Sequence, residues 1–265
     1  VHHKKAEAMK ELDVADEESF TAARPEGKVV KNIMLRCAST KLPFAHQVPA
    51  KGVDEDKHVV KLVCDDLGWM GHAKITMKCD NEPALKKVIA EALVLGKVDV
   101  ADLEGISKER PGKYESQSNG SVEVGIKNFR GHHRALRRCL GKRLGVEIPV
   151  CHPLAAWLTK HVCVLMSATV RGGDGPTGWA RARGRPVRQR LVGFVEACLH
   201  KLPTKGPQHD AEGNMGPRWK SAVFLGHSRD SNSYIPGTCE GIVTPRAVMR
   251  RPMGERWSLA EAKSV

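Results

Sequence analysis

The chain lacks a long apolar run and a C-x-x-C pair, and it has few aromatic residues. No apolar segment approaches the length of a bilayer span and no signal peptide is recognisable, so we expect no membrane partner. The eight cysteines are scattered, and we expect core thiols in a reducing intracellular compartment. Aromatic residues make up only 5% of the 265 residues, but 41% is hydrophobic, which is enough for a real core.

The chain has an excess of positive charge, but only in its second half. Residues 1–123 carry 19 Lys and Arg against 21 Asp and Glu, whereas residues 124–265 carry 24 against 9. A near-neutral half followed by a strongly basic half favours a catalytic fold joined to a polyanion-binding surface. The alternative is a basic surface that serves only solubility.

The apolar pattern of the first 170 residues predicts alternating strands and helices. We expect strands at 28–38, 42–49 and 73–79, and helices at 54–67, 83–95, 121–144 and 151–170. Gly68 and Gly96 should end the first two helices, and the polar stretch 97–119 should be a long loop. This order of elements indicates a layered α/β core.

Residues 171–190 differ in composition, with seven Gly or Pro residues and six arginines. They predict an Arg/Gly/Pro-rich linker with a short helix near Trp179. The arginines favour non-specific phosphate binding and are compatible with nuclear targeting. Strand-like runs at 191–202, 220–226, 232–236 and 240–249 then predict a small β-rich C-terminal module at 191–265.

Two short acidic motifs point to chemistry. KCDNEP (78–83) places Asp80 at the end of a predicted strand, and QSNGSVE (117–123) places Glu123 in the first turn of a predicted helix. Carboxylates at the edge of an α/β sheet can hold divalent metal ions that act on phosphodiesters. Each acid also has a purely structural interpretation, Asp80 as a helix cap before Pro83 and Glu123 as a favourable charge near a helix N-terminus.

These motifs resemble the last two acids of a retroviral-type integrase core, in particular that of copia-type retrotransposons. That family has Asp-Asn-Gly at the end of a core strand and Ser-Asn-Gly-x-x-Glu at the start of the next long helix. SNGSVE (118–123) matches in full, whereas Glu82 replaces the glycine of the first motif. HPLAAWL (152–158) and KSAVFLGH (220–227) resemble further family segments, so the resemblance covers roughly residues 28–251 of what we expect to be a polyprotein fragment.

The resemblance implies an RNase H-like core over residues 1–170, with a mixed central sheet flanked by helices. It implies an integrase, a polynucleotidyl transferase and endonuclease that processes DNA ends and transfers them into target DNA, using two Mg²⁺ or Mn²⁺ ions. Asp80 and Glu123 would be metal ligands. Asp13 is the best candidate for the first acid and Asp16 the second, although a solvated acidic run is the alternative. Implied partners are element-end and target DNA, in a nuclear homo-oligomer.

The helix predicted after Glu123 is basic along one face. Lys127 and Arg130 lie four and seven residues beyond Glu123, which predicts a face that holds a DNA backbone. The full set of predicted DNA-binding residues is Asn119, Lys127, Arg130, Arg134, Arg137 and Arg138. The alternative is a solvated amphipathic helix. Zinc at His132-His133 is disfavoured, because only Cys139 lies nearby among possible ligands.

Two rival interpretations stay open. The first is a decayed or repurposed integrase that binds DNA without catalysis, which the uncertain first acid and Glu82 favour. The second is another RNase H-like nuclease or transposase, which the segments 152–158 and 220–227 fit poorly.

Overall fold

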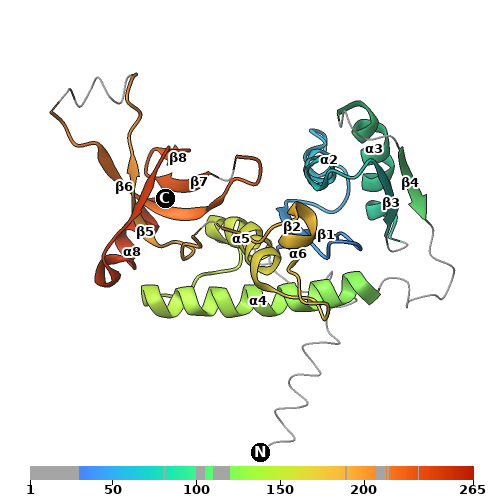
Figure 1. The fold of residues 1–265 in the computed structure, drawn as a ribbon, viewed down its shortest axis with the longest axis horizontal. Coiled ribbons are helices and arrows are strands. Elements are labelled where there is room, and N and C mark those ends of the chain that lie inside the picture. Colours follow the sequence, from blue (N-terminus) through green and yellow to red (C-terminus); the bar gives the residue numbers. More distant parts are fainter. Residues whose placement is uncertain are drawn as a thin grey trace, which may run out of the picture.

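In the computed structural model, the described residues form two lobes that share one long helix (Figure 1). These residues are 30–79, 82–99, 105–109, 120–188, 190–206, 213, 215–231 and 233–265. The first lobe contains β1 (Lys31–Arg36), β2 (Pro43–Val48), α2 (His58–Met70), β3 (Lys74–Lys78), α3 (Pro83–Asp99) and β4 (Gly105–Glu109). Three helices follow, α4 (Gly120–Leu144), α5 (Pro153–Thr169) and α6 (Gly178–Arg183).

The second lobe is a five-stranded antiparallel sheet. Its elements are β5 (Ala197–Lys201), β6 (Trp219–His227), β7 (Tyr234–Thr238), β8 (Gly241–Ile242), β9 (Val248–Arg250), the 3₁₀ helix η3 (Met253–Glu255) and α8 (Leu259–Lys263). The strand order is β8-β7-β6-β5-β9. The run predicted at 240–249 is divided into β8 and β9, because Pro245 lies between them and cannot donate to a strand ladder.

The strands of the first lobe pair in two ways. β1 and β2 form an antiparallel hairpin, and β3 and β4 form a parallel pair joined through α3. The chain is therefore a mixed α/β protein, as predicted. Within the described residues the two pairs remain separate two-stranded sheets, so the single central sheet of an RNase H-like core stays a prediction.

Three sequence-based predictions in this lobe are wrong. β4 lies inside the predicted loop 97–119. Its position depends on pairing with β3, in which Ile106 lies opposite Ile75. The five residues of β4 contain only one apolar residue, so they show no alternation of apolar and polar positions. Gly68 and Gly96 lie inside α2 and α3 instead of ending them. An internal helical glycine costs only about 1 kcal/mol relative to alanine, so packing can override it. α2 ends at Gly71, whose φ is 67°.

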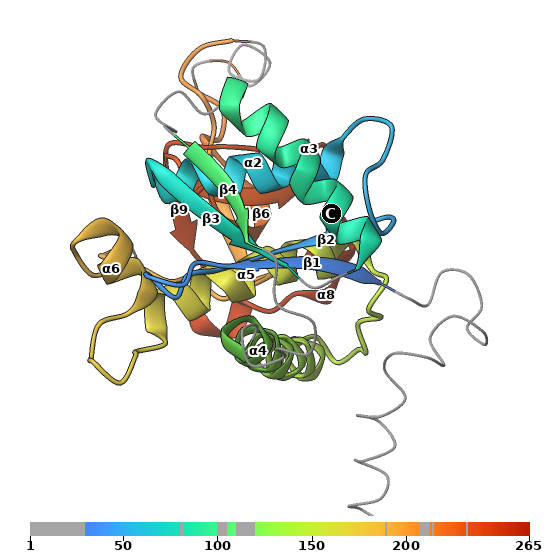
Figure 2. The ribbon, with the colours of Figure 1, turned by 90° about the vertical axis from the view of Figure 1, so that its right-hand side faces the viewer.

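The main hydrophobic core is shared by both lobes. Phe129 of α4, Leu158 and Val162 of α5 and Val223 of β6 belong to one buried cluster. Figure 2 shows β1 and β2 between α2 and α3 on one side and α4 and α5 on the other. Apolar burial thus fixes α4 and α5 against both lobes. No described helix is long and apolar enough to cross a membrane.

The short helix predicted near Trp179 is present as α6, and it packs on the first lobe. Gly178 lies so close to the β1–β2 turn that an added Cβ would be 3.1 Å from the Thr40 carbonyl oxygen. The Trp179 and Trp69 rings lie 5.7 Å apart, and the guanidinium of Arg183 lies 4.1 Å from the centre of the Trp69 ring. This part of the segment 171–190 is therefore held against α2.

Candidate nucleic-acid interface and acidic site

α4 is the most basic element of the structure. Its 25 residues include seven Lys or Arg residues and a single acid, Glu123. Phe129, Leu140 and Leu144 are buried in the shared core, which defines the inner face of the helix. The remaining circumference is left for polar side chains.

The basic side chains of α4 form a stripe that starts at Glu123. At about 100° per residue, Glu123 and the five predicted basic residues lie within about 100° of one another around the helix axis. The stripe consists of Lys127, Arg130, Arg134, Arg137 and Arg138, which are exposed except for the half-buried Arg137. Lys127, Arg134 and Arg138 form no ion pair with any carboxylate in the described ranges. This basic stripe therefore presents uncompensated positive charge to solvent.

The first turn of α4 is anchored to the end of β1. Arg36 donates hydrogen bonds to the carbonyl oxygen and the hydroxyl of Ser121. Gly125 is buried against this arginine, since an added Cβ would lie 2.8 Å from Arg36 Cδ. Neither Arg36 nor Ser121 was predicted from the sequence to anchor this helix. The available signal was the internal glycine, which a helix tolerates only at a cost.

The structure places one of the predicted metal ligands. Glu123 lies exposed in the first turn of α4, where its carboxylate oxygens can act as hard ligands and the helix dipole favours negative charge. Asp13, Asp16, Asp80 and the predicted DNA contact Asn119 lie outside the described residues. Among the residues that are described, no group of three His, Cys, Asp or Glu side chains could hold a metal ion.

The two adjacent histidines of α4 lie in different surroundings. His132 Nδ1 is 2.8 Å from the carbonyl oxygen of Asn128, one helical turn earlier. His133 is half-buried with its ring 5.7 Å from Phe129, and burial, followed by the charge of Arg137, lowers its pKa. Contacts within α4 and with the shared core therefore explain the positions of both histidine side chains.

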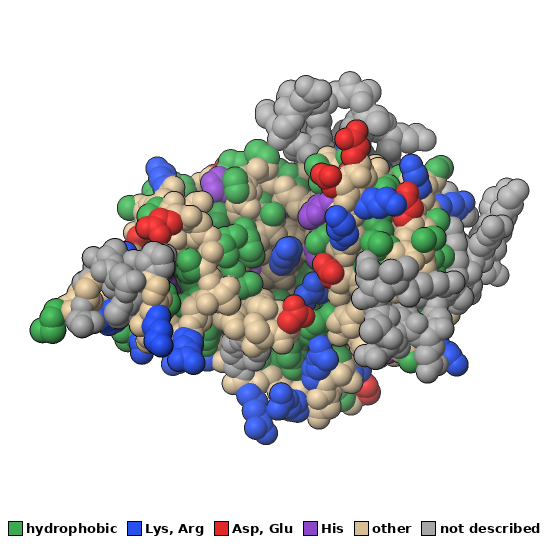
Figure 3. Space-filling model, turned by 90° about the horizontal axis from the view of Figure 1, so that it is seen from above, with side chains coloured by type: hydrophobic (Ala, Val, Ile, Leu, Met, Phe, Trp, Pro, Cys, Tyr) green, Lys and Arg blue, Asp and Glu red, His purple; other side chains and the backbone are tan. Residues whose placement is uncertain are grey.

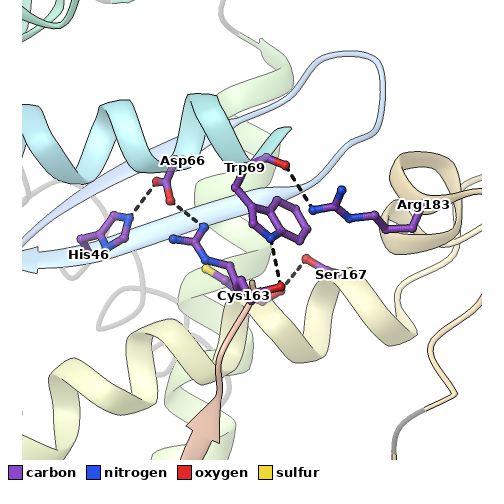
Figure 4. Close-up of polar contacts among 7 residues, drawn as sticks. His46, Asp66, Trp69, Cys163, Ser167 and Arg183 are labelled. Carbon is purple, nitrogen blue, oxygen red and sulfur yellow. Dashed lines mark hydrogen bonds and ion pairs between the residues drawn. The ribbon is translucent and has the colours of Figure 1, made fainter. Parts of the chain in front are cut away.

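A buried ionic network that has no local sequence signature joins the lobes. The carboxylate of Asp66 in α2 is completely buried and lies 2.7 Å from His46 Nε2 and 2.6 Å from Arg229 Nη1. Trp69 donates its indole N–H to the Arg229 carbonyl oxygen at 3.1 Å, and Arg183 donates to the Trp69 carbonyl oxygen at 3.2 Å (Figure 4). Arg229 follows β6, so the network ties the second lobe to α2 and α6.

Comparisons with known proteins establish no family for the chain. No protein-family model and no curated protein matches it. Among solved structures, it is similar to a chain of the simian T-cell lymphotropic virus intasome in complex with the PP2A regulatory subunit B56 gamma. The match has 11% sequence identity, covers 87% of this chain and 75% of that chain, and has a TM-score of 0.42. At this score the match does not establish a common fold.

Proposed function

We propose that this protein is an integrase-type enzyme that binds DNA along α4 and joins DNA ends to target DNA. The observation that carries the proposal is the basic stripe of α4, which begins at the exposed Glu123 and contains three cations without a described carboxylate partner. Such a surface suits phosphate groups, and its position next to an acid suits chemistry on the bound backbone. Nuclear action as a homo-oligomer belongs to the same proposal.

In this mechanism the lysine and arginine side chains hold the DNA backbone, and Glu123 supplies one carboxylate at the reaction centre. Two Mg²⁺ or Mn²⁺ ions bound with Asp13 and Asp80 would provide an activated nucleophile and stabilise the leaving oxygen. The hydrogen bonds from Arg36 to Ser121 fix the first turn of α4 against β1. They thereby fix the position of the Glu123 backbone, which lies in the same turn.

A second candidate function is DNA binding without catalysis. The basic stripe supports it directly, because phosphate binding by Lys and Arg needs no carboxylate. Under this second function the chain would bind DNA ends but would not join them to target DNA.

DNA binding is tested by reversing charge on the stripe. The double variant Lys127→Glu and Arg130→Glu should weaken duplex binding at least tenfold, and it should reduce the slope of log affinity against log salt by about two. The matched control reverses the exposed Lys61 of α2 and Lys87 of α3, which makes the same charge change. These two helices lie on the side of β1 and β2 opposite to α4 (Figure 2). Equal losses for both double variants would refute a specific role of α4.

Catalysis is tested by joining of a labelled DNA end to plasmid DNA with Mg²⁺ or Mn²⁺. Asp80→Asn and Glu123→Gln preserve side-chain size and should abolish joining while leaving duplex binding within about twofold, because the cations make the grip. Asp13→Asn and Asp16→Asn identify the first acid by which of them loses activity. An unmodified protein that binds DNA but joins none with either metal would refute the enzyme and leave the DNA-binding function.

A further inference from the structure

A cavity lies where α5 meets both lobes. Its volume is about 230 Å³, and its walls come from β2, the end of α2, α5, α6, the end of β6 and β7. Figure 3 shows the surface hollowed between the lobes, with hydrophobic, histidine, basic and acidic side chains around the hollow. None of the residues of the basic stripe lines this cavity.

Tryptophan is concentrated at this cavity. The chain has only five tryptophans, and three of them, Trp69, Trp157 and Trp179, line the wall. All three are half-buried, and the Trp69 ring also has the guanidinium of Arg183 4.1 Å from its centre. Phe44 packs edge-on against Trp69 at 5.8 Å and closes the aromatic side of the wall. Flat aromatic surfaces of this kind favour a planar ring as the occupant.

Two cations lie on the same wall. Arg229 already has a carboxylate partner, Asp66, with which it forms an ion pair at 2.6 Å. Lys160 is different: its ammonium lies 5.5 Å from the centre of the Trp157 ring, and it has no ion pair with a carboxylate of the described chain. Burial, followed by the charge of Arg229, lowers the pKa of Lys160, although the carboxylates of Asp66 and Asp65 act in the opposite direction. An anion directly beside the ammonium would therefore stabilise its charged form.

Two of the three histidines of the wall do not compete for that anion. His161 and His227 line the cavity, and burial lowers the pKa of each to about 4. Both imidazoles are therefore neutral near pH 7. The third histidine of the wall, His46, is held by the carboxylate of Asp66, which lies 2.7 Å from its Nε2. The wall as a whole offers flat aromatic rings, imidazoles and the Lys160 ammonium, which has no ion pair with a described carboxylate.

We propose that this cavity binds one nucleotide, with its base against the tryptophan rings and its phosphate beside Lys160. A cavity of 150 Å³ holds benzene, so about 230 Å³ admits a larger heterocycle such as a nucleobase. Stacking on an aromatic side chain contributes about 1–3 kcal/mol per base. The nucleotide is either free in solution or an unpaired nucleotide of DNA, and the second source rests on the proposed function.

The test uses the full chain and AMP as the probe, followed by tryptophan fluorescence. AMP should quench the fluorescence saturably, whereas ribose 5-phosphate, which lacks the base, should not. Lys160→Gln should weaken AMP binding about tenfold and leave adenosine binding unchanged, because adenosine has no phosphate. Lys201→Gln, an exposed lysine at the end of β5, is the matched control and should change neither. Equal binding of AMP and ribose 5-phosphate, or equal effects of the two variants, would overturn the proposal.

A second variant tests the cavity by filling it. Val164→Phe enlarges a half-buried wall residue and should abolish AMP quenching while leaving the unfolding temperature near that of the unmodified protein. Undiminished AMP binding by a folded Val164→Phe protein would overturn the proposal. If this variant fails to fold, the Lys160→Gln result still decides.

The source of the nucleotide is distinguished with DNA. A duplex with one unpaired adenosine should bind more tightly than the fully paired duplex, and Lys160→Gln should remove that difference, if the DNA supplies the base. AMP binding without this preference assigns the cavity to a free nucleotide. The Lys127→Glu and Arg130→Glu protein should keep its AMP binding in either case, so failure of the DNA-binding function and failure of the cavity proposal are separable.

Discussion

Arg229 and Asp66 form an ion pair of 2.6 Å across 163 positions of sequence, and the carboxylate of this pair is completely buried. The second oxygen of Asp66 lies 2.7 Å from His46 Nε2, so both oxygens have partners. The pair connects α2 to the turn after β6. This charged pair lies in the interface that also contains the shared hydrophobic core.

Asp66→Asn should destabilise the protein strongly. Breaking a buried pair by removing one partner typically costs about 3–5 kcal/mol, because the remaining charge loses its compensation. Urea unfolding monitored by circular dichroism would measure the loss. Asp65→Asn, at the exposed neighbouring position, should change the unfolding free energy by less than about 0.5 kcal/mol. Equal midpoints for the two variants would show that the network contributes no stability.

The glycines of α4 should respond differently to alanine. Gly131 is exposed with no atom within 4 Å of an added Cβ, so Gly131→Ala should raise the unfolding free energy by about 1 kcal/mol through helix propensity. At Gly125 the added Cβ would meet Arg36 and displace it from Ser121, which offsets the gain. Chemical denaturation of both variants checks the difference. An equal gain at the two positions would contradict the close approach of α4 and β1.

Acid should weaken the protein through His161. Burial lowers the folded pKa of His161 to about 4 from 6.5, so the unfolded chain takes up the proton first as the pH falls. Stability should therefore decrease between about pH 6.5 and about pH 4, by about 3 kcal/mol for this residue. His161 packs against Phe194 and Phe224, so His161→Phe should fold and show a shallower pH dependence in urea titrations. If His161→Phe leaves the pH dependence of stability unchanged, groups other than His161 cause the loss of stability in acid.

Cysteine alkylation should separate the thiols by pH. Burial raises the pKa of Cys37, but hydrogen bonds from Ser39, Thr40 and His72 outweigh it and lower the pKa to about 6. Burial raises the pKa of Cys163 and of Cys198 to about 12. Iodoacetamide labelling read by peptide mass spectrometry should give a Cys37 rate with a midpoint near pH 6, while Cys163 and Cys198 stay unlabelled. Ser39→Ala should move the midpoint upward, and a midpoint near that of free cysteine would contradict the structure.

Local patterns predicted most elements of the fold. α4 and α5 were foreseen within two residues at each end, because each has an apolar stripe at helical spacing. β4 was not predicted, because it forms through pairing with β3 and its own five residues carry no strand pattern. The helix ends predicted at Gly68 and Gly96 were wrong, because tertiary packing outweighs the low helix propensity of glycine at these positions.

Of the predicted site residues, those carried by the single helix α4 lie within the described residues, and for the others the site stays a prediction. Helical spacing alone places Lys127 and Arg130 on the face of Glu123, and the structure shows them exposed there. The anchor of that helix, Arg36, lies 85 residues from Ser121 and has no local signature. The same holds for Asp66 and Arg229, whose pairing depends on the docking of the two lobes.

The length of the basic stripe sets the extent of DNA that α4 can cover. Lys127 and Arg138 are separated by eleven residues, which corresponds to about 16 Å along the helix axis. A DNA strand has one phosphate per about 3.4 Å of duplex, so a backbone running along α4 would pass about five phosphates. A single copy of this helix would therefore have a footprint of about half a turn of duplex.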